Sequence, residues 1–123
     1  MMSISNYAEL KLLEHVTGYG SFTMPSNVYL KLHTGDPGED CTDNPATETT
    51  RKITAWAAAA SGAIATSATV EWTNVAATET YSHWSMWDAS TAGNPLWSGA
   101  LSASAAVTSG DTFQITSLTL SLD

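Results

Sequence analysis

Residues 79–101 read ETYSHWSMWDASTAGNPLWSGAL, and this stretch decides the fold because it has the pattern of a strand, a turn and a second strand. Side chains alternate along a strand, which predicts one face with Tyr81, His83, Ser85 and Trp87 and another with Ser82, Trp84 and Met86. Both faces carry bulky groups, so this strand is expected to be covered on both sides or to lie at a subunit contact. Residues 88–94 are rich in turn formers, with positive φ angles expected at Gly93-Asn94, and Pro95 can open the return strand.

A short N-terminal helix is predicted for residues 5–17. Asn6 is a candidate N-cap, with Glu9 three residues later, and Gly18 ends the helix. An apolar stripe at helical spacing is expected to face the protein; it consists of Ile4, Ala8, Leu12, Leu13 and Val16.

The other periodic segments favour strands. Residues 28–33 alternate cleanly, which is typical of a half-solvated antiparallel strand, and residues 51–60 and 63–73 fit a hairpin around Ser61-Gly62. The alternation in residues 112–122 reverses at Thr116-Ser117, where we expect a β-bulge or a change of sheet. The predicted fold is mainly β: a single domain of residues 1–123, built as a jelly-roll-like antiparallel β-sandwich with one short N-terminal helix.

Residues 34–50 form a long polar loop that holds five of the twelve acidic residues. Their spacing lacks the Asp-x-Asp-x-Asp-Gly pattern of a calcium loop, so no metal is expected there. We predict instead a loop that is solvated or touches a partner. The candidate partner contacts are Asp36, Glu39, Asp40 and Asp43.

The whole-chain composition narrows the classes of partner. The net charge is −8, which argues against nucleic-acid binding because phosphate backbones repel an acidic domain. Charged residues make up only 13 %, about half the usual ~25 %, which suits a surface that neighbours cover. No signal peptide and no apolar stretch long enough for a bilayer are recognised, so we expect no membrane partner and synthesis in the cytoplasm.

No arrangement for catalysis emerges from the sequence, so we predict a protein that is not an enzyme and needs no cofactor. Cys41 with His33 or His83 would form a catalytic pair only if the fold joined them, and its acidic neighbours disfavour a thiolate. Ser85, His83 and Asp88 lie close in sequence without an elbow turn. For the five tryptophans, burial in the core is the preferred expectation, a contact between subunits is the second, and a platform that stacks on sugar rings is the third.

Several short motifs, taken in order, resemble a family of small virion proteins of tailed bacteriophages, either tail-fibre-like or head decoration proteins. The motifs are Val28-Tyr29-Leu30 running into His33-Thr34-Gly35-Asp36-Pro37, then Trp87-Asp88-Ala89, Gly93-Asn94, Gly99-Ala100-Leu101 and Ser109-Gly110-Asp111-Thr112-Phe113. The resemblance implies a structural β-sandwich without known chemistry, located in the virion.

The expected function is therefore decoration or cementing of the capsid surface, assembled in the host cytoplasm. The expected partners are the major capsid protein and further copies of the chain, as a homotrimer or homodimer that matches the local capsid symmetry. The alternative is a tail-fibre or baseplate module that binds a host receptor or glycan.

Overall fold

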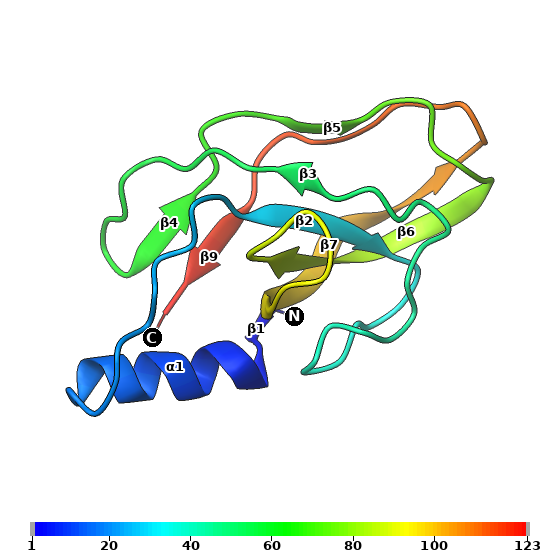
Figure 1. Cartoon of the computed structure of the whole chain (residues 1–123). Coiled ribbons are helices and arrows are strands. Elements are labelled where there is room, and N and C mark those ends of the chain that lie inside the picture. The colour runs from blue at the N-terminus through cyan, green and yellow to red at the C-terminus, as the bar shows by residue number, and fades with distance from the viewer. Residues whose placement is uncertain (1, 123) are drawn as a thin grey trace.

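A computed structural model of the chain describes residues 2–122 (Figure 1). The described residues form one helix and nine strands: β1 (Met2–Ile4), α1 (Asn6–Val16), β2 (Tyr29–His33), β3 (Lys52–Ile53), β4 (Ala63–Ala65), β5 (Val70–Trp72), β6 (Glu79–Trp87), β7 (Pro95–Val107), β8 (Phe113–Ile115) and β9 (Thr119–Ser121). The prediction of a mainly β, antiparallel fold with a short N-terminal helix is confirmed. The helix is too short to cross a membrane, and the described residues contain no other helix.

The main sheet has five strands in the order β1-β7-β6-β2-β3, and all its pairings are antiparallel. Its centre is the β6–β7 hairpin that residues 79–101 predicted, and Pro95 does open the return strand. Two small sheets, β4-β9 and β5-β8, complete the fold. The connection pattern of a jelly roll stays a prediction.

The hydrophobic core lies between one face of the main sheet and the two small sheets. Leu32 and Trp84 are opposite each other on β2 and β6, and both are buried. Trp72 of β5 and Ile115 of β8 belong to the same cluster and pack on it from the small sheets. Leu120 of β9 also belongs to it. The main sheet therefore contributes the even positions 30, 32, 84 and 86 to the core, as alternation predicts.

Tyr81 departs from this alternation, so its predicted placement with His83, Ser85 and Trp87 was wrong. The pairing register between β6 and β7 shifts between Tyr81 and His83, where β7 carries extra residues. Such a shift reverses the side-chain phase. Tyr81 therefore enters the core, where its ring centroid lies 5.2 Å from that of Phe113.

The N-cap of α1 lies one residue earlier than predicted. The N-cap is Ser5, whose hydroxyl accepts a hydrogen bond from the Ala8 amide and donates one to the Pro95 carbonyl at 2.6 Å. Asn6 is the first helical residue, so its assignment as the cap was wrong. The predicted stop at Gly18 is confirmed by its φ of +76°.

The predicted hairpin of residues 51–60 and 63–73 forms over residues 55–67. Ser61 and Gly62 both have positive φ, and backbone hydrogen bonds join Ala60 and Ala63 in both directions. Backbone hydrogen bonds from Ala57 to Ala65 and from Ser67 to Ala55 continue the hairpin past the turn. The flanking strands pair elsewhere, β3 with β2 and β5 with β8. The hairpin around Ser61-Gly62 is therefore confirmed for residues 55–67, whereas the predicted pairing of its outer ends was wrong.

Two connections between strands were predicted from the sequence, and the structure confirms the first and shifts the second by one residue. The break at Thr116-Ser117 is a change of sheet, since β8 pairs with β5 and β9 with β4. In the β6–β7 turn the pair with positive φ is Ala92-Gly93, one residue earlier than expected.

Candidate interaction surfaces

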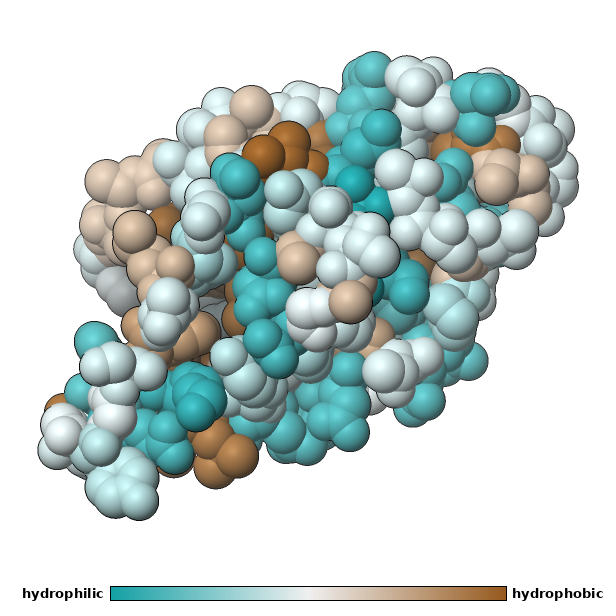
Figure 2. All heavy atoms as spheres, viewed as in Figure 1, coloured by the Kyte–Doolittle hydropathy of each residue, from teal (hydrophilic) through white to brown (hydrophobic). Residues whose placement is uncertain are grey.

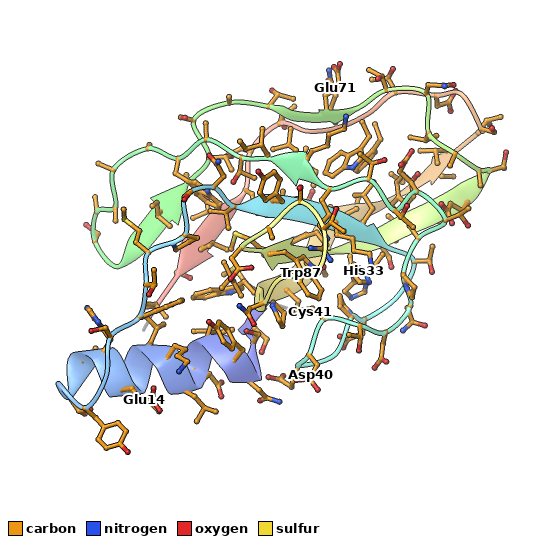
Figure 3. The ribbon with its side chains drawn as sticks, viewed as in Figure 1. Glu14, His33, Asp40, Cys41, Glu71 and Trp87 are labelled. Atoms are coloured by element: carbon orange, nitrogen blue, oxygen red, sulfur yellow. The ribbon has the colours of Figure 1, made fainter. Side chains whose placement is uncertain are left out.

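The acidic loop, residues 34–50, folds across the face of the main sheet that points away from the core. Its residues 44 and 46 bond to the backbone at the end of β2, through Thr34 N to Asn44 O and Ala46 N to Leu32 O. Its tip reaches β1 and α1, where the Asn6 amide donates to the Glu39 carbonyl. Figure 3 shows His33 and Cys41 between the loop and the sheet. This loop explains how bulky residues on both faces of β6 are covered within one chain.

The four carboxylates predicted as partner contacts all lie on the solvent side of this loop. Asp36, Glu39, Asp40 and Asp43 are exposed, and Asp40 points outward in Figure 3. Hydrogen bonds fix part of the set: Asp36 accepts from the Gly38 amide at 2.9 Å, and Glu39 accepts from the Ser3 hydroxyl at 3.1 Å. Across residues 2–122 the one ion pair is Lys11–Glu14, so these carboxylates have no cationic partner there.

The fifth acid of the loop has a structural task. Glu48 is buried, and its carboxylate accepts hydrogen bonds from the amides of Ala76 and Thr50. Glu79 complements it by accepting from the amides of Thr47 and Glu48 itself. These two carboxylates satisfy backbone groups that a loop cannot satisfy alone, which fixes its end nearest β3.

Beneath the loop, three side chains form a buried hydrogen-bond chain. His33 Nδ1 lies 2.8 Å from the Asp43 carbonyl, so Nδ1 carries the proton and Nε2 accepts from the Ser85 hydroxyl at 2.7 Å. Ser85 in turn accepts from Trp87 Nε1. Burial lowers the pKa of His33, with Lys31 adding to this effect. The expected half-solvated face of β2 is therefore fully buried at His33.

This arrangement does not provide a catalytic centre. His33 and Ser85 are fully buried, and the group that orients the imidazole is a backbone carbonyl rather than a carboxylate. Cys41 is also fully buried, and burial raises the pKa of its thiol to about 11. Among residues 2–122 no three histidine, cysteine or acidic side chains gather closely enough to hold a metal ion.

Arg51 holds the β6–β7 turn against the sheet. Its guanidinium carbon lies 4.1 Å from the centroid of the Trp87 ring, and Nη1 donates to the carbonyls of Ala89 and Ala92 at 2.9 and 2.7 Å. A cation over an aromatic face with two directed hydrogen bonds is a contact that lysine cannot reproduce.

The second surface is an apolar groove of about 340 Å³, which lies between α1 and the strands β4, β7 and β9. Figure 2 shows the hollow beside α1 with hydrophobic residues on its walls. Its lining carries no charged side chain and includes Leu12, Phe22, Trp56, Ile64, Trp97, Leu120 and Leu122. A smaller hollow of about 230 Å³ along β4 and β9 shares four of these residues and extends the groove.

The helix does not cover this groove with its whole apolar side. Ala8 is buried and Leu12 half-buried, but Leu13 and Val16 expose 64 % and 81 % of their surfaces. The prediction that the complete stripe faces the protein was therefore wrong for its C-terminal half. Leu10, which is 63 % exposed, lies farther round the same helix.

The tryptophans divide between core and groove. Trp72, Trp84 and Trp87 are buried, as the first expectation stated. Trp56 and Trp97 are half-buried and line the groove among apolar neighbours. The groove could not be predicted from the sequence, because its lining residues come from both ends of the chain. The one local signal was that α1 carries more leucine and valine than a single buried face of a short helix needs.

The chain is similar to a known protein family. The sequence profile of a family described as "Podophage GP4 fiber I protein gp80" matches residues 3–123, which is nearly the whole chain. No curated protein matches the sequence.

Proposed function

Because this chain belongs to the podophage GP4 fiber I protein family, we propose that it is a non-enzymatic structural subunit that decorates and cements the phage capsid. Family membership places it among the structural proteins of a virion. In the proposed role, copies of the chain bridge neighbouring major capsid subunits as a homodimer or homotrimer. Each contact is weak, and multivalency supplies the total strength of attachment.

The observation that carries this proposal is the set of exposed, unpaired carboxylates on the acidic loop. Asp36, Glu39, Asp40 and Asp43 sit on a segment that backbone hydrogen bonds hold in place. Fixed charges on a preordered loop suit docking onto a basic protein surface, because little conformational entropy is lost on binding. The N-terminal end of α1 is joined to the same loop and completes the proposed contact.

The buried histidine and cysteine support the non-enzymatic part. A substrate would have to displace the acidic loop to reach His33 or Ser85. The Cys41 thiol, with a pKa of about 11, is protonated at neutral pH and is a poor nucleophile.

The experiment compares particle occupancy of two double variants. Glu39→Gln with Asp40→Asn removes two loop charges, while Glu71→Gln with Asp111→Asn removes two exposed charges at the far end of the domain. The loop variant should show lower occupancy on purified particles at low salt, and its difference from the wild type should shrink as salt increases, because salt screens the exposed charges that the wild type retains. Equal occupancy of both variants would contradict the role of the loop.

A second candidate is a tail-fibre or baseplate module that binds a host receptor or glycan. The word "fiber" in the family description and the half-buried Trp56 and Trp97 favour it. A cryo-EM reconstruction of the particle separates the two candidates. Density in a regular lattice over the shell supports capsid decoration, whereas density only at the tail or its fibres rejects it. In that case, tryptophan fluorescence that responds to host polysaccharide supports the receptor-binding role.

A further inference from the structure

Most of the exposed large apolar side chains gather in one region of the molecule. Seven such side chains are strongly exposed among residues 2–122, and six of them lie on α1, on the loop after it, or on the groove rim. These six are Leu10, Leu13, Val16, Tyr19, Met24 and Leu122, with 60–85 % of each surface exposed. Together they amount to several hundred Å² of apolar surface, which is on the order of the ~800 Å² that a stable interface buries on each partner.

We propose that this region is the contact between two copies of the chain, in which the exposed ridge of α1 from one copy lies in the apolar groove of the other. The ridge consists of Leu10, Leu13 and Val16, and the groove is the one bounded by Trp56, Trp97 and Leu122. Every copy carries both the ridge and the groove, so a twofold dimer contains two identical ridge-in-groove contacts.

The spacing of the ridge fits a groove. Leu10, Leu13 and Val16 recur at every third position of an 11-residue helix, and side chains at this spacing lie along one side. A helix that presents apolar anchors at this spacing is the usual occupant of a hydrophobic groove. The groove beside α1 is open along the strands β4 and β9, where the smaller hollow continues it.

Charge favours a second copy at this place. The chain carries a net charge of −8, so two copies repel each other wherever their acidic surfaces meet. Neither the ridge nor the groove lining contains a charged residue. The acidic loop covers the other face of the main sheet, so this contact keeps the carboxylates of that loop out of the interface. The inference does not depend on where the protein sits in the virion.

The test measures the mass of the purified chain in solution by light scattering and sedimentation equilibrium over a range of concentrations. The wild type should associate reversibly. Leu13→Glu should raise the dissociation constant by roughly two orders of magnitude or more, because a twofold contact contains the hot-spot residue twice. Leu122→Glu alters the groove side and should have a similar effect.

The matched control is Ile53→Glu, which places the same charge on a side chain that is 55 % exposed but lies on β3, outside the groove. It should leave association unchanged. All three side chains are exposed, so circular dichroism should show the same fold for each variant. Mixing Leu13→Glu with Leu122→Lys should restore association, because opposite charges then meet in the groove.

Two results would overturn the proposal. One is a wild type that stays monomeric at every concentration. If Leu13→Glu still prevents incorporation of such a monomer into particles, the ridge binds another protein and not a second copy of the chain. The other is an oligomer that neither Leu13→Glu nor Leu122→Glu weakens, since the contact then lies elsewhere.

Discussion

His33 Nε2 lies 2.7 Å from the hydroxyl of Ser85, although 52 residues separate them in the sequence. The contact joins β2 to β6 beneath the acidic loop, and Trp87 extends it by donating to the same hydroxyl. In this chain the imidazole is neutral, because Ser85 needs an acceptor at Nε2 and burial lowers the pKa of His33.

The first prediction concerns pH. The folded-state pKa of His33 lies below its ordinary value of about 6.5, so the unfolded chain binds this proton more readily. The free energy of unfolding should therefore be fully retained above that value and should fall as pH drops through the lowered folded-state pKa. Urea titrations between neutral and mildly acidic pH measure this, and His33→Gln should flatten the dependence. His15→Gln, at an exposed histidine, is the control; an unchanged slope in His33→Gln would count against this account.

The second prediction concerns the close approach of β7 to Trp84. A Cβ at Gly99 would lie 2.7 Å from Cζ2 of the Trp84 ring, which is fully enclosed. Gly99→Ala should lower the free energy of unfolding by about 1–3 kcal/mol through overpacking. At Gly20 the same substitution meets its nearest atom at 3.5 Å, so Gly20→Ala is the control in chemical denaturation. Equal stabilities would show that the ring moves freely.

The third prediction tests the cap of α1. Ser5→Ala removes the acceptor for the Ala8 amide and the donor to the Pro95 carbonyl, and it should cost about 1–2 kcal/mol. Asn6→Ala removes only a long, exposed contact to Asp40 and should be nearly neutral. Thermal unfolding of both variants distinguishes the two residues. A larger loss for Asn6→Ala would return the cap to the position that the sequence suggested.

The fourth prediction concerns the clamp on the β6–β7 turn. Arg51→Lys keeps the charge but loses the fork that reaches Ala89 and Ala92, so residues 88–94 should exchange their amide hydrogens faster. Hydrogen exchange followed by mass spectrometry measures this locally. Lys52→Arg, one residue away, should leave the turn unchanged. Unaltered exchange in Arg51→Lys would mean that the turn holds itself.

The fifth prediction uses the single cysteine. Cys41 is fully buried and its pKa is raised to about 11, so a thiol reagent near neutral pH should react slowly with the folded protein. Urea above the unfolding transition should restore a rate typical of a free thiol. Fast labelling of the native protein would contradict the packing of the acidic loop.

The sequence predicts the local elements well, because each depends on neighbours along the chain. The β6–β7 hairpin, the stop at Gly18 and the break at Thr116-Ser117 all follow from periodicity or turn chemistry. The errors concern distant partners. Ser5 caps the helix while bonding to Pro95, 90 residues away, and Tyr81 enters the core because of extra residues in β7.

The acidic loop and the apolar groove differ in how much of each could be predicted from the sequence. The acidic loop was recognisable from its length and composition, whereas the hydrogen bonds that order it connect it to β1, α1 and β6 through the fold. The apolar groove was not recognisable, because Leu12, Trp97 and Leu122 meet only in three dimensions.

The pairing of β9 with β4 and of β8 with β5 has a consequence for the order in which the chain can fold on the ribosome. Both small sheets need residues 113–121, which are synthesised after every other strand. Until they emerge, Leu30, Trp72 and Trp84 lack part of their cover, so the nascent chain exposes its future interior. Distant pairings of this kind also slow folding, because long loops must close first. The hydrophobic core is therefore closed only after residues 113–121 have been made.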